Sequence, residues 1–210
     1  MRSDVARAGD MVKVWIAYTD GMDWEEAKSL PLVTPLDVDG ADRYVLPDDK
    51  VLHLVSAYLK RRLVGEWTVA ESGKPKAEGV CFNLSHTTGA VAIALSDREI
   101  GVDIERIRSV DEELIDYVCA PAEREEVHSD ADFFRIWTAK ESLIKAHGKG
   151  FDRHPDVIPA LPIEGVREYL GAPYRCRQTA WEGWVLSVSV TGDAPFDWEI
   201  QEIPLPTQRV

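Results

Sequence analysis

The segment Gly101-Val102-Asp103-Ile104-Glu105 alternates apolar and acidic residues, which is the pattern of a β-strand with one buried face. Val102 and Ile104 are expected to face the core, which leaves Asp103 and Glu105 together on the other face. Residues two apart in a strand have Cα atoms roughly 6.6 Å apart, so the two carboxylates can converge on one cation. Mg²⁺ is commonly held by one or two carboxylates plus substrate phosphates. The alternative is a half-exposed hairpin strand whose acids face solvent.

A second segment, from Trp137 to Lys145, has helical spacing and carries both an acid and bases. Trp137, Glu141 and Lys145 lie on one stripe at i,i+4 spacing, and Lys140 lies beside Glu141 on a neighbouring stripe. In the functional interpretation, Glu141 ligates a metal or accepts a proton while Lys145 neutralises a phosphate oxygen. The alternative is a surface Glu-Lys pair worth roughly 0.2–0.5 kcal/mol.

A third segment, Phe82-Asn83-Leu84-Ser85-His86-Thr87-Thr88-Gly89, passes from a predicted strand into small polar residues. Its backbone N–H groups, hydroxyls and imidazole could together bind an anion. Upstream, Gly73-Lys74-Pro75 places a cation in a rigid loop. Taken separately, these segments are equally consistent with a turn and a solvated lysine.

Hydrophobic periodicity elsewhere predicts an α+β fold. The predicted strands are 12–18, 80–84, 90–95, 100–105, 174–179, 184–190 and 196–203, and the predicted helices are 47–64, 112–118, 122–127 and 132–146. Residues 96–99 are expected to form a hairpin turn, and the last three strands an antiparallel meander. Residues 31–42 are expected to form a loop, and 151–171 a loop ending in a short helix at 164–170. Asp130 or Asp132 is expected to cap the helix that ends before Gly148.

Composition limits the possible classes of protein. The chain has 210 residues, 45% of them hydrophobic, which is enough for one core or for two small lobes that share one. A net charge of -13 argues against nucleic acid as a partner, although salt screening leaves room for a local cationic pocket. We expect a cytoplasmic protein, because neither a signal peptide nor a membrane span is evident. Cys81, Cys119 and Cys176 fit no CxxC spacing and are expected to be free thiols.

Four segments in this order resemble one protein family. Lys74-Pro75, Phe82 to His86, Gly101 to Glu105 and Trp137 to Lys145 resemble the signature of the 4′-phosphopantetheinyl transferase superfamily, of the surfactin-synthetase-activating (Sfp) type. The resemblance implies two similar lobes forming a pseudo-dimer, each with helices packed on a small antiparallel sheet. The lobes are expected at 1–104, on the coenzyme A side, and at 105–210, with the helix that contains Trp137 and the closing sheet. A fused two-lobed chain favours a monomer.

The resemblance also implies an activity. Members of the family transfer the 4′-phosphopantetheine arm of coenzyme A to a serine of an apo acyl or peptidyl carrier protein, with Mg²⁺, and release 3′,5′-ADP. The carriers serve fatty acid, polyketide or nonribosomal peptide biosynthesis, and the sequence does not indicate which. By this resemblance the metal ligands are Asp103, Glu105 and Glu141, the catalytic residues are Glu141, Lys145 and Asp103, and the coenzyme-binding residues are Arg43, Lys50, Lys74, Ser85, His86, Lys140 and Lys145.

The chain departs from the family pattern at two places. Val51 stands where a hydroxyl residue is common in relatives, and residues 151–154 differ from the usual continuation. Two other classes of protein stay open: a non-catalytic module that binds coenzyme A or a carrier protein, and a metal-dependent phosphohydrolase acting on a nucleotide.

Overall fold

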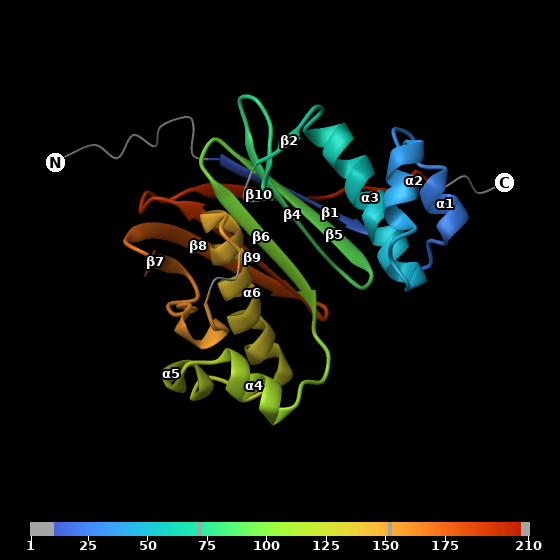
Figure 1. Ribbon diagram of the computed structural model, residues 1–210. Coiled ribbons are helices and arrows are strands. Elements are labelled where there is room, and N and C mark those ends of the chain that lie inside the picture. Colours follow the sequence, from blue (N-terminus) through green and yellow to red (C-terminus); the bar gives the residue numbers. More distant parts are fainter. Residues whose placement is uncertain (1–10, 71–72, 151–152, 207–210) are drawn as a thin grey trace.

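Two β-sheets pack face to face, with helices on their outer surfaces, in a computed structural model that describes residues 11–70, 73–150 and 153–206 (Figure 1). The strand order is β10-β1-β5-β4 in the first sheet and β6-β9-β8-β7 in the second. The first sheet contains β1 (Met11–Tyr18), β4 (Cys81–Thr87), β5 (Ala90–Ser96) and β10 (Asp197–Glu202). The second contains β6 (Ile100–Arg106), β7 (Gly165–Tyr169), β8 (Ala172–Trp181) and β9 (Trp184–Thr191).

The helices form the outer layers. The first sheet carries α1 (Trp24–Lys28), α2 (Pro35–Ala41) and α3 (Pro47–Leu63), with the short strands β2 (Thr68–Val69) and β3 (Pro75–Lys76) beyond them. The second carries α4 (Glu112–Val118), α5 (Pro121–Arg124), α6 (Asp130–His147) and the 3₁₀ turn η1 (Pro155–Val157). We call each sheet with its helices a lobe. The predicted α+β class with two lobes is therefore confirmed.

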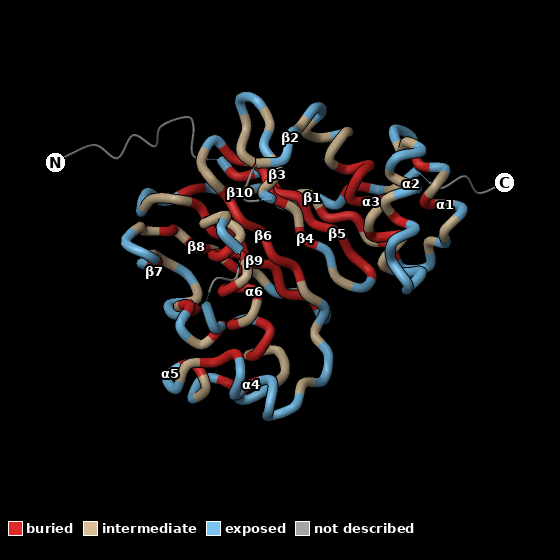
Figure 2. The backbone as a smooth tube through the Cα atoms, viewed as in Figure 1, coloured by how far each residue is buried: buried red, intermediate tan, exposed pale blue. Residues whose placement is uncertain are grey.

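The main core lies between the sheets because β1, β5, β6 and β9 each turn alternate apolar residues inward. Figure 2 shows β5, β6 and β9 as nearly continuous buried stretches, whereas β1 alternates between buried and more exposed residues. The residues at this interface include Val12, Val14, Ile16, Ala92, Ala94, Val102, Ile104, Leu186, Val188 and Val190. The outer faces of the sheets pack against the helices in separate clusters.

The two long helices were predicted from local signals. Pro47 occupies the first turn of α3, where its missing N–H costs nothing. Gly148 ends α6 in the left-handed conformation with φ of 82°, as expected. The predicted cap of α6 was wrong, because Ser129 is the N-cap and its side chain accepts from the Asp132 N–H. None of the helices in the described part of the chain combines the length and apolar character needed to cross a membrane.

The pairing of the strands differs from the prediction in two places. Residues 96–99 do not close a hairpin, because β5 and β6 belong to different sheets and the turn carries the chain from one to the other. The final meander is also wrong in its last strand. β8 and β9 pair antiparallel, but β10 crosses to the first sheet and pairs parallel with β1. The predicted lobe boundary at residue 104 stays a prediction, although β6 and β10 show that the sheets themselves divide elsewhere.

Two elements were assigned wrongly from composition. The predicted helix at 164–170 is the strand β7, in which Arg167 and Tyr169 are buried alternately with exposed Glu168. Leu170 and Gly171 both have positive φ, at 51° and 79°, as a two-residue hairpin loop before β8 requires. The predicted loop at 31–42 contains α2, whose proline lies at the start of the helix, where a proline is tolerated.

Candidate active site

The edge strands of the two sheets, β4 and β6, lie side by side without pairing through their backbones. We call this junction the seam. Polar side chains at alternate positions of β4 replace the missing backbone ladder. Asn83 Oδ1 accepts from the Val102 N–H at 2.9 Å, Ser85 Oγ donates to Asp103 Oδ1 at 2.7 Å, and Thr87 Oγ1 donates to Glu105 Oε2 at 2.9 Å.

Helix α6 packs on the seam through a residue without a side chain. A Cβ atom built on Gly101 would lie 2.0 Å from the Ser142 carbonyl oxygen and 2.3 Å from the Ala146 nitrogen. Only glycine therefore allows the α6 backbone to approach β6 this closely. On the adjacent strand β9, Ser189 Oγ lies 2.9 Å from Ser142 Oγ. This close contact brings the acidic face of β6 against the helix.

The predicted stripe of α6 faces that acidic surface. Lys145 Nζ lies 2.6 Å from Asp103 Oδ1 and 3.0 Å from Ser85 Oγ. The indole Nε1 of Trp137 donates to Glu105 Oε1 at 3.4 Å. Residues from three of the four sequence motifs thus meet at one place.

Asp103 is the most deeply buried acid of the group, with 3% of the residue exposed. Burial raises the pKa of its carboxyl, and the charge of Lys145 and the hydrogen bond from Ser85 act in the opposite direction. Its second oxygen, Oδ2, is buried and accepts no hydrogen bond from the described residues. A buried carboxylate oxygen without a donor is costly, so this atom is available to a ligand from outside the chain.

Glu141 is half-buried, and its carboxyl is harder to ionise than usual. Burial first, and then the negative charges of Asp103 and Glu105, together raise the pKa of Glu141 to about 7, while the charge of Lys145 acts in the opposite direction. Within the described residues its carboxylate has neither a hydrogen bond nor an ion pair with another side chain. Glu105, in contrast, also pairs with Arg108, whose Nη1 lies 2.9 Å from Oε2.

The three predicted metal ligands are neighbours but do not form a ready ligand set. Across the parts of the chain that the structure describes, no three His, Cys, Asp or Glu side chains are arranged to hold a metal ion. Lys145 pairs with Asp103, and Arg108 pairs with Glu105. The assignment of all three acids to one cation stays a prediction.

The structure places the predicted coenzyme-binding residues in several separate environments. Ser85 lies at the seam, and His86 follows it on the opposite face of β4, where it is exposed. The pKa of the His86 imidazole is lowered. The main cause is the partial loss of contact with water, and the positive charge of Lys145 adds to it. Lys74 is held elsewhere. Its Nζ contacts Glu99 Oε2 at 2.6 Å and the carbonyls of Ile100 and Ala146 at 3.1 and 3.2 Å.

Lys140 has a structural environment that differs from its predicted role. Its side chain is fully buried, and Nζ lies 2.5 Å from Glu123 Oε2. The same nitrogen donates to the carbonyls of Pro155 and Ile158 at 2.9 and 2.8 Å. The structure therefore does not bring Lys140 to the seam, and its role as a coenzyme-binding residue stays a prediction.

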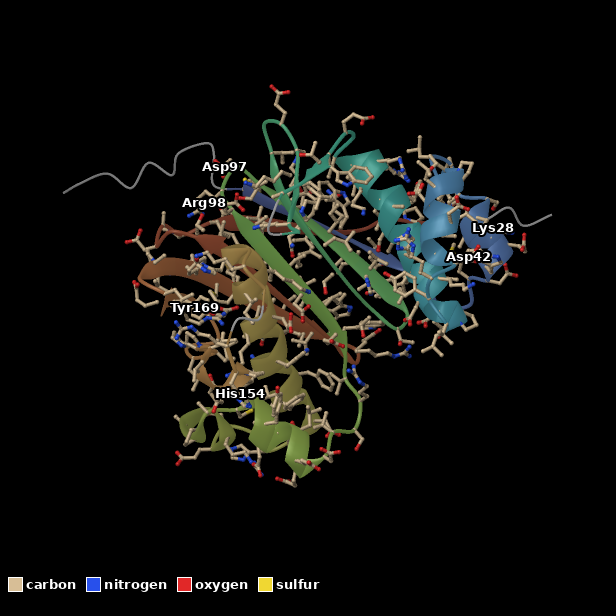
Figure 3. The ribbon with its side chains drawn as sticks, viewed as in Figure 1. Lys28, Asp42, Asp97, Arg98, His154 and Tyr169 are labelled. Atoms are coloured by element: carbon tan, nitrogen blue, oxygen red, sulfur yellow. The ribbon has the colours of Figure 1, made fainter. Side chains whose placement is uncertain are left out.

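Arg43 and Lys50 lie near the start of α3. Arg43 is exposed, while Lys50 Nζ lies 3.0 Å from Asp42 Oδ1 and 5.2 Å from the centre of the Trp24 ring. Figure 3 shows Asp42 at the helical end of the first lobe, well away from Asp97 and Arg98 beside β6. Among the described residues neither base forms a hydrogen bond or ion pair with Asp103, Glu105, Glu141 or Ser85, and their coenzyme-binding role stays a prediction.

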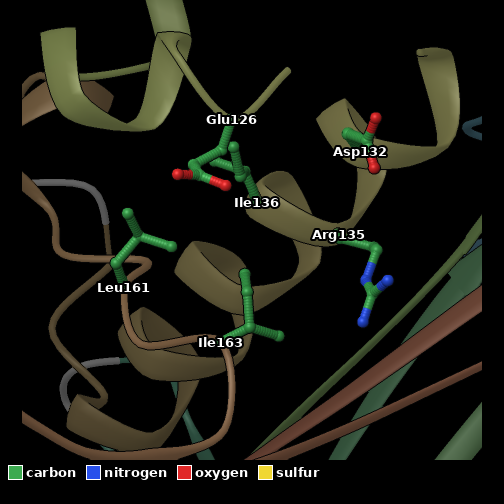
Figure 4. A pocket seen from close by; sticks show the side chains of 6 residues that line it. All are labelled: Glu126, Asp132, Arg135, Ile136, Leu161 and Ile163. Atoms are coloured by element: carbon green, nitrogen blue, oxygen red, sulfur yellow. The ribbon is translucent and has the colours of Figure 1, made fainter. Parts of the chain in front are cut away.

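Two cavities lie away from the contact between Asp103 and Lys145, and neither residue lines them. One, of about 130 Å³, lies between α6 and the loop before β7, and Figure 4 shows Leu161 and Ile163 on one side of it and Arg135 on the other. Another, of about 260 Å³, lies beside the β4–β5 turn and includes Asp20, Asp48 and Gly89 in its lining.

Two features of the site do not follow from the sequence motifs. These are the close approach of α6 to Gly101 and the contact of Thr87 with Glu105. A glycine inside a strand pattern, such as Gly101, is a signal that can indicate the close approach of another backbone. Nothing local to Thr87 reveals its partner, because Glu105 is on a strand of the other sheet.

The chain is similar to proteins of one superfamily. Residues 99–197 match the model of the 4′-phosphopantetheinyl transferase superfamily. The 4′-phosphopantetheinyl transferase gsp of Aneurinibacillus migulanus is 38% identical over 90 residues, which cover 38% of this chain and 37% of the relative. The corresponding protein psf-1 of Bacillus pumilus is 37% identical over 92 residues, 38% of each chain.

A third relative aligns over more of the chain. The 4′-phosphopantetheinyl transferase HetI of Nostoc sp. is 27% identical over 214 residues, which cover 85% of this chain and 86% of the relative. With gsp and psf-1, in contrast, the chain spans little more than a third of the relative's length. The Sfp-type resemblance seen in the four motifs is thus confirmed.

Proposed function

We propose that the protein transfers the 4′-phosphopantetheine arm of coenzyme A to a serine hydroxyl of an apo acyl or peptidyl carrier protein, releasing 3′,5′-ADP. The observation that carries the proposal is the contact of Asp103 with both Lys145 and Ser85, since each comes from a different family motif. The superfamily match over 99–197 includes Asp103 and Lys145.

The oxygen atoms at the seam are of the chemical type that holds a magnesium ion, although no three acids of the described residues are arranged around one point. Asp103 Oδ2 has no donor among the described residues, and the Glu141 carboxylate has no partner there. Both are oxygen atoms of the type that Mg²⁺ prefers, and a cation would offset the mutual repulsion that raises the Glu141 pKa. Asp103, Glu141 and Glu105 would hold it. When bound, it would neutralise charge on the diphosphate of coenzyme A.

The chain's own side chains can perform the remaining steps. Glu141 supplies a carboxylate that can accept the proton of the carrier serine. The serine oxygen then forms a bond to the phosphorus of the phosphopantetheine group, and the bond from that phosphorus to the bridging oxygen breaks. Lys145 supplies positive charge beside this centre, where negative charge gathers on the leaving 3′,5′-ADP. Ser85 and His86 offer hydrogen bonds to the phosphates.

The proposal is tested by measuring the mass of a carrier protein after reaction. The full chain is mixed with Mg²⁺, coenzyme A and an apo carrier, and the carrier is examined by mass spectrometry. A mass gain of one phosphopantetheine arm supports transfer. Asp103→Asn and Glu141→Gln are expected to abolish the gain, and Glu168→Gln, an exposed position on β7, serves as the matched control. Full turnover by either site variant would contradict the roles assigned to these acids.

A non-catalytic module that binds coenzyme A or a carrier is the second candidate. It is favoured by the lack of a three-ligand metal arrangement among the described residues. In the same assay, an unchanged carrier together with bound, intact coenzyme A would support this candidate. Hydrolysed coenzyme A without carrier modification would instead indicate a phosphohydrolase.

A further inference from the structure

Thr87 contacts the predicted metal ligand Glu105 directly from the other sheet. Its Oγ1 lies 2.9 Å from Glu105 Oε2. An ionised carboxylate has only acceptors, so the threonine hydroxyl is the donor. The contact therefore holds the Glu105 Oε2 atom in place from the first sheet.

Thr87 is held in place more firmly than the other partner of the same oxygen. Arg108 also donates to Glu105 Oε2, at 2.9 Å, but 59% of its side chain is exposed. A long exposed side chain loses conformational freedom in such a pair and gains little. Threonine is short and β-branched, and Thr87 pairs with Ala90 at the end of the β4–β5 hairpin.

Charge also distinguishes the two contacts. A divalent cation beside Glu105 would repel the guanidinium of Arg108, whereas the hydroxyl of Thr87 is neutral. The Trp137 indole, 3.4 Å from the other oxygen, is neutral as well. Of the two donors to Oε2, the Thr87 hydroxyl is thus the one that can remain in place when a cation binds.

We infer that Thr87 is a positioning residue that orients the Glu105 carboxylate toward the cation. Partners behind a metal ligand fix its orientation, and losing one typically weakens metal binding by about 10–100-fold. Because the hydrogen bond crosses the seam, it also fixes the position of β4 relative to the acidic face of β6. This inference rests on the proposed function, because it assumes that Glu105 is a ligand.

The inference is tested by metal binding in the absence of coenzyme and carrier. The full chain and its variants are titrated with Mn²⁺, and free Mn²⁺ is measured by electron paramagnetic resonance. Thr87→Val keeps the shape and removes the hydroxyl. It is expected to raise the Mn²⁺ dissociation constant by about 10–100-fold. Thr87→Ser, which keeps the hydroxyl, is expected to bind like the wild type.

Two controls separate positioning from damage to the fold. Thr88→Val changes the adjacent, exposed threonine and is expected to leave Mn²⁺ binding unchanged. At saturating Mg²⁺, Thr87→Val is expected to regain near-normal turnover, which a merely unfolded fraction would not do. Weak Mn²⁺ binding in Thr87→Ser, or normal binding in Thr87→Val, would overturn the inference.

The outcome also shows which proposal has failed. If Glu105→Gln weakens Mn²⁺ binding and Thr87→Val does not, the positioning role is wrong and the proposed function stands. If Asp103→Asn, Glu105→Gln and Glu141→Gln all bind Mn²⁺ like the wild type, the ligand set itself is wrong and the positioning role falls with it.

Discussion

The ammonium nitrogen of Lys145 lies 2.6 Å from Oδ1 of Asp103, so a cation of α6 and an acid of β6 pair across the seam. Asp103 is almost fully enclosed, whereas 27% of the Lys145 side chain stays exposed. The lysine can therefore neutralise the buried acid and still be reached by a phosphate group.

Replacing Lys145 by alanine is expected to slow transfer more than it weakens coenzyme binding. Removing one group that stabilises developing charge typically costs about 10²–10³-fold in kcat. The measurement is steady-state transfer to a carrier at varied coenzyme A. Lys149→Ala, an exposed lysine just beyond α6, is the control. A Lys145→Ala variant with normal kcat and a raised KM would contradict the assignment.

Replacing Gly101 by alanine is expected to lower the free energy of unfolding by at least about 3 kcal/mol, because overpacking against backbone cannot be relieved by a side-chain rotation. The new methyl group would meet the Ser142 carbonyl at 2.0 Å. Urea unfolding measures the change. Gly40→Ala is the matched control, because its Cβ would meet only the movable ring of His53, at 2.9 Å. Equal stability of the two variants would show that α6 does not need the close approach.

Replacing Lys140 by methionine is expected to lower stability by about 3–5 kcal/mol, since it leaves Glu123 buried without its cation. The double variant Lys140→Met/Glu123→Gln should recover much of this loss, because neither charge remains buried. Denaturant unfolding gives both values. Coenzyme A affinity of the folded single variant is expected to be unchanged, and a large loss of affinity would support the predicted coenzyme-binding role of Lys140.

The Glu141 pKa predicts a pH dependence of stability. The folded state raises this pKa from 4.5 to about 7, so folding favours the protonated form. The contribution is fully present below pH 4.5 and is lost as pH rises through 7. Glu141→Gln, which stays neutral, should therefore match the wild type at low pH and exceed its stability at pH 8 by at most about 3 kcal/mol. Thermal unfolding of the two proteins without divalent metal, at low pH and at pH 8, checks this. A difference in stability between the two proteins that is the same at both pH values would contradict the prediction.

The sequence predicted those features of the site that depend on local geometry. Alternation placed Asp103 and Glu105 on one strand face, and i,i+4 spacing placed Glu141 and Lys145 on one helix stripe. The sequence could not predict the environment of Lys140. This environment depends on Glu123 and on the carbonyls of residues 155 and 158, which come close to the helix only in the folded chain.

The connections between strands were predicted less well for a similar reason. Residues 96–99 have the composition of a hairpin turn, but nothing local to them determines which strand β6 pairs with. The face-to-face sheets give β6 a better partner in β9, with Val102 opposite Val188 and Asp103 opposite Ser187. Likewise, β10 has no local signal for its parallel partner β1, which lies at the other end of the described chain.

The pairing of β1 with β10 has a consequence for biosynthesis. During translation, β1 leaves the ribosome long before Asp197–Glu202, so the first sheet is exposed along the β1 edge until that final strand arrives. An open edge of this kind can pair with other chains. Shortening the protein before residue 197 is therefore expected to harm the first lobe, although the deleted residues follow the second lobe in the sequence.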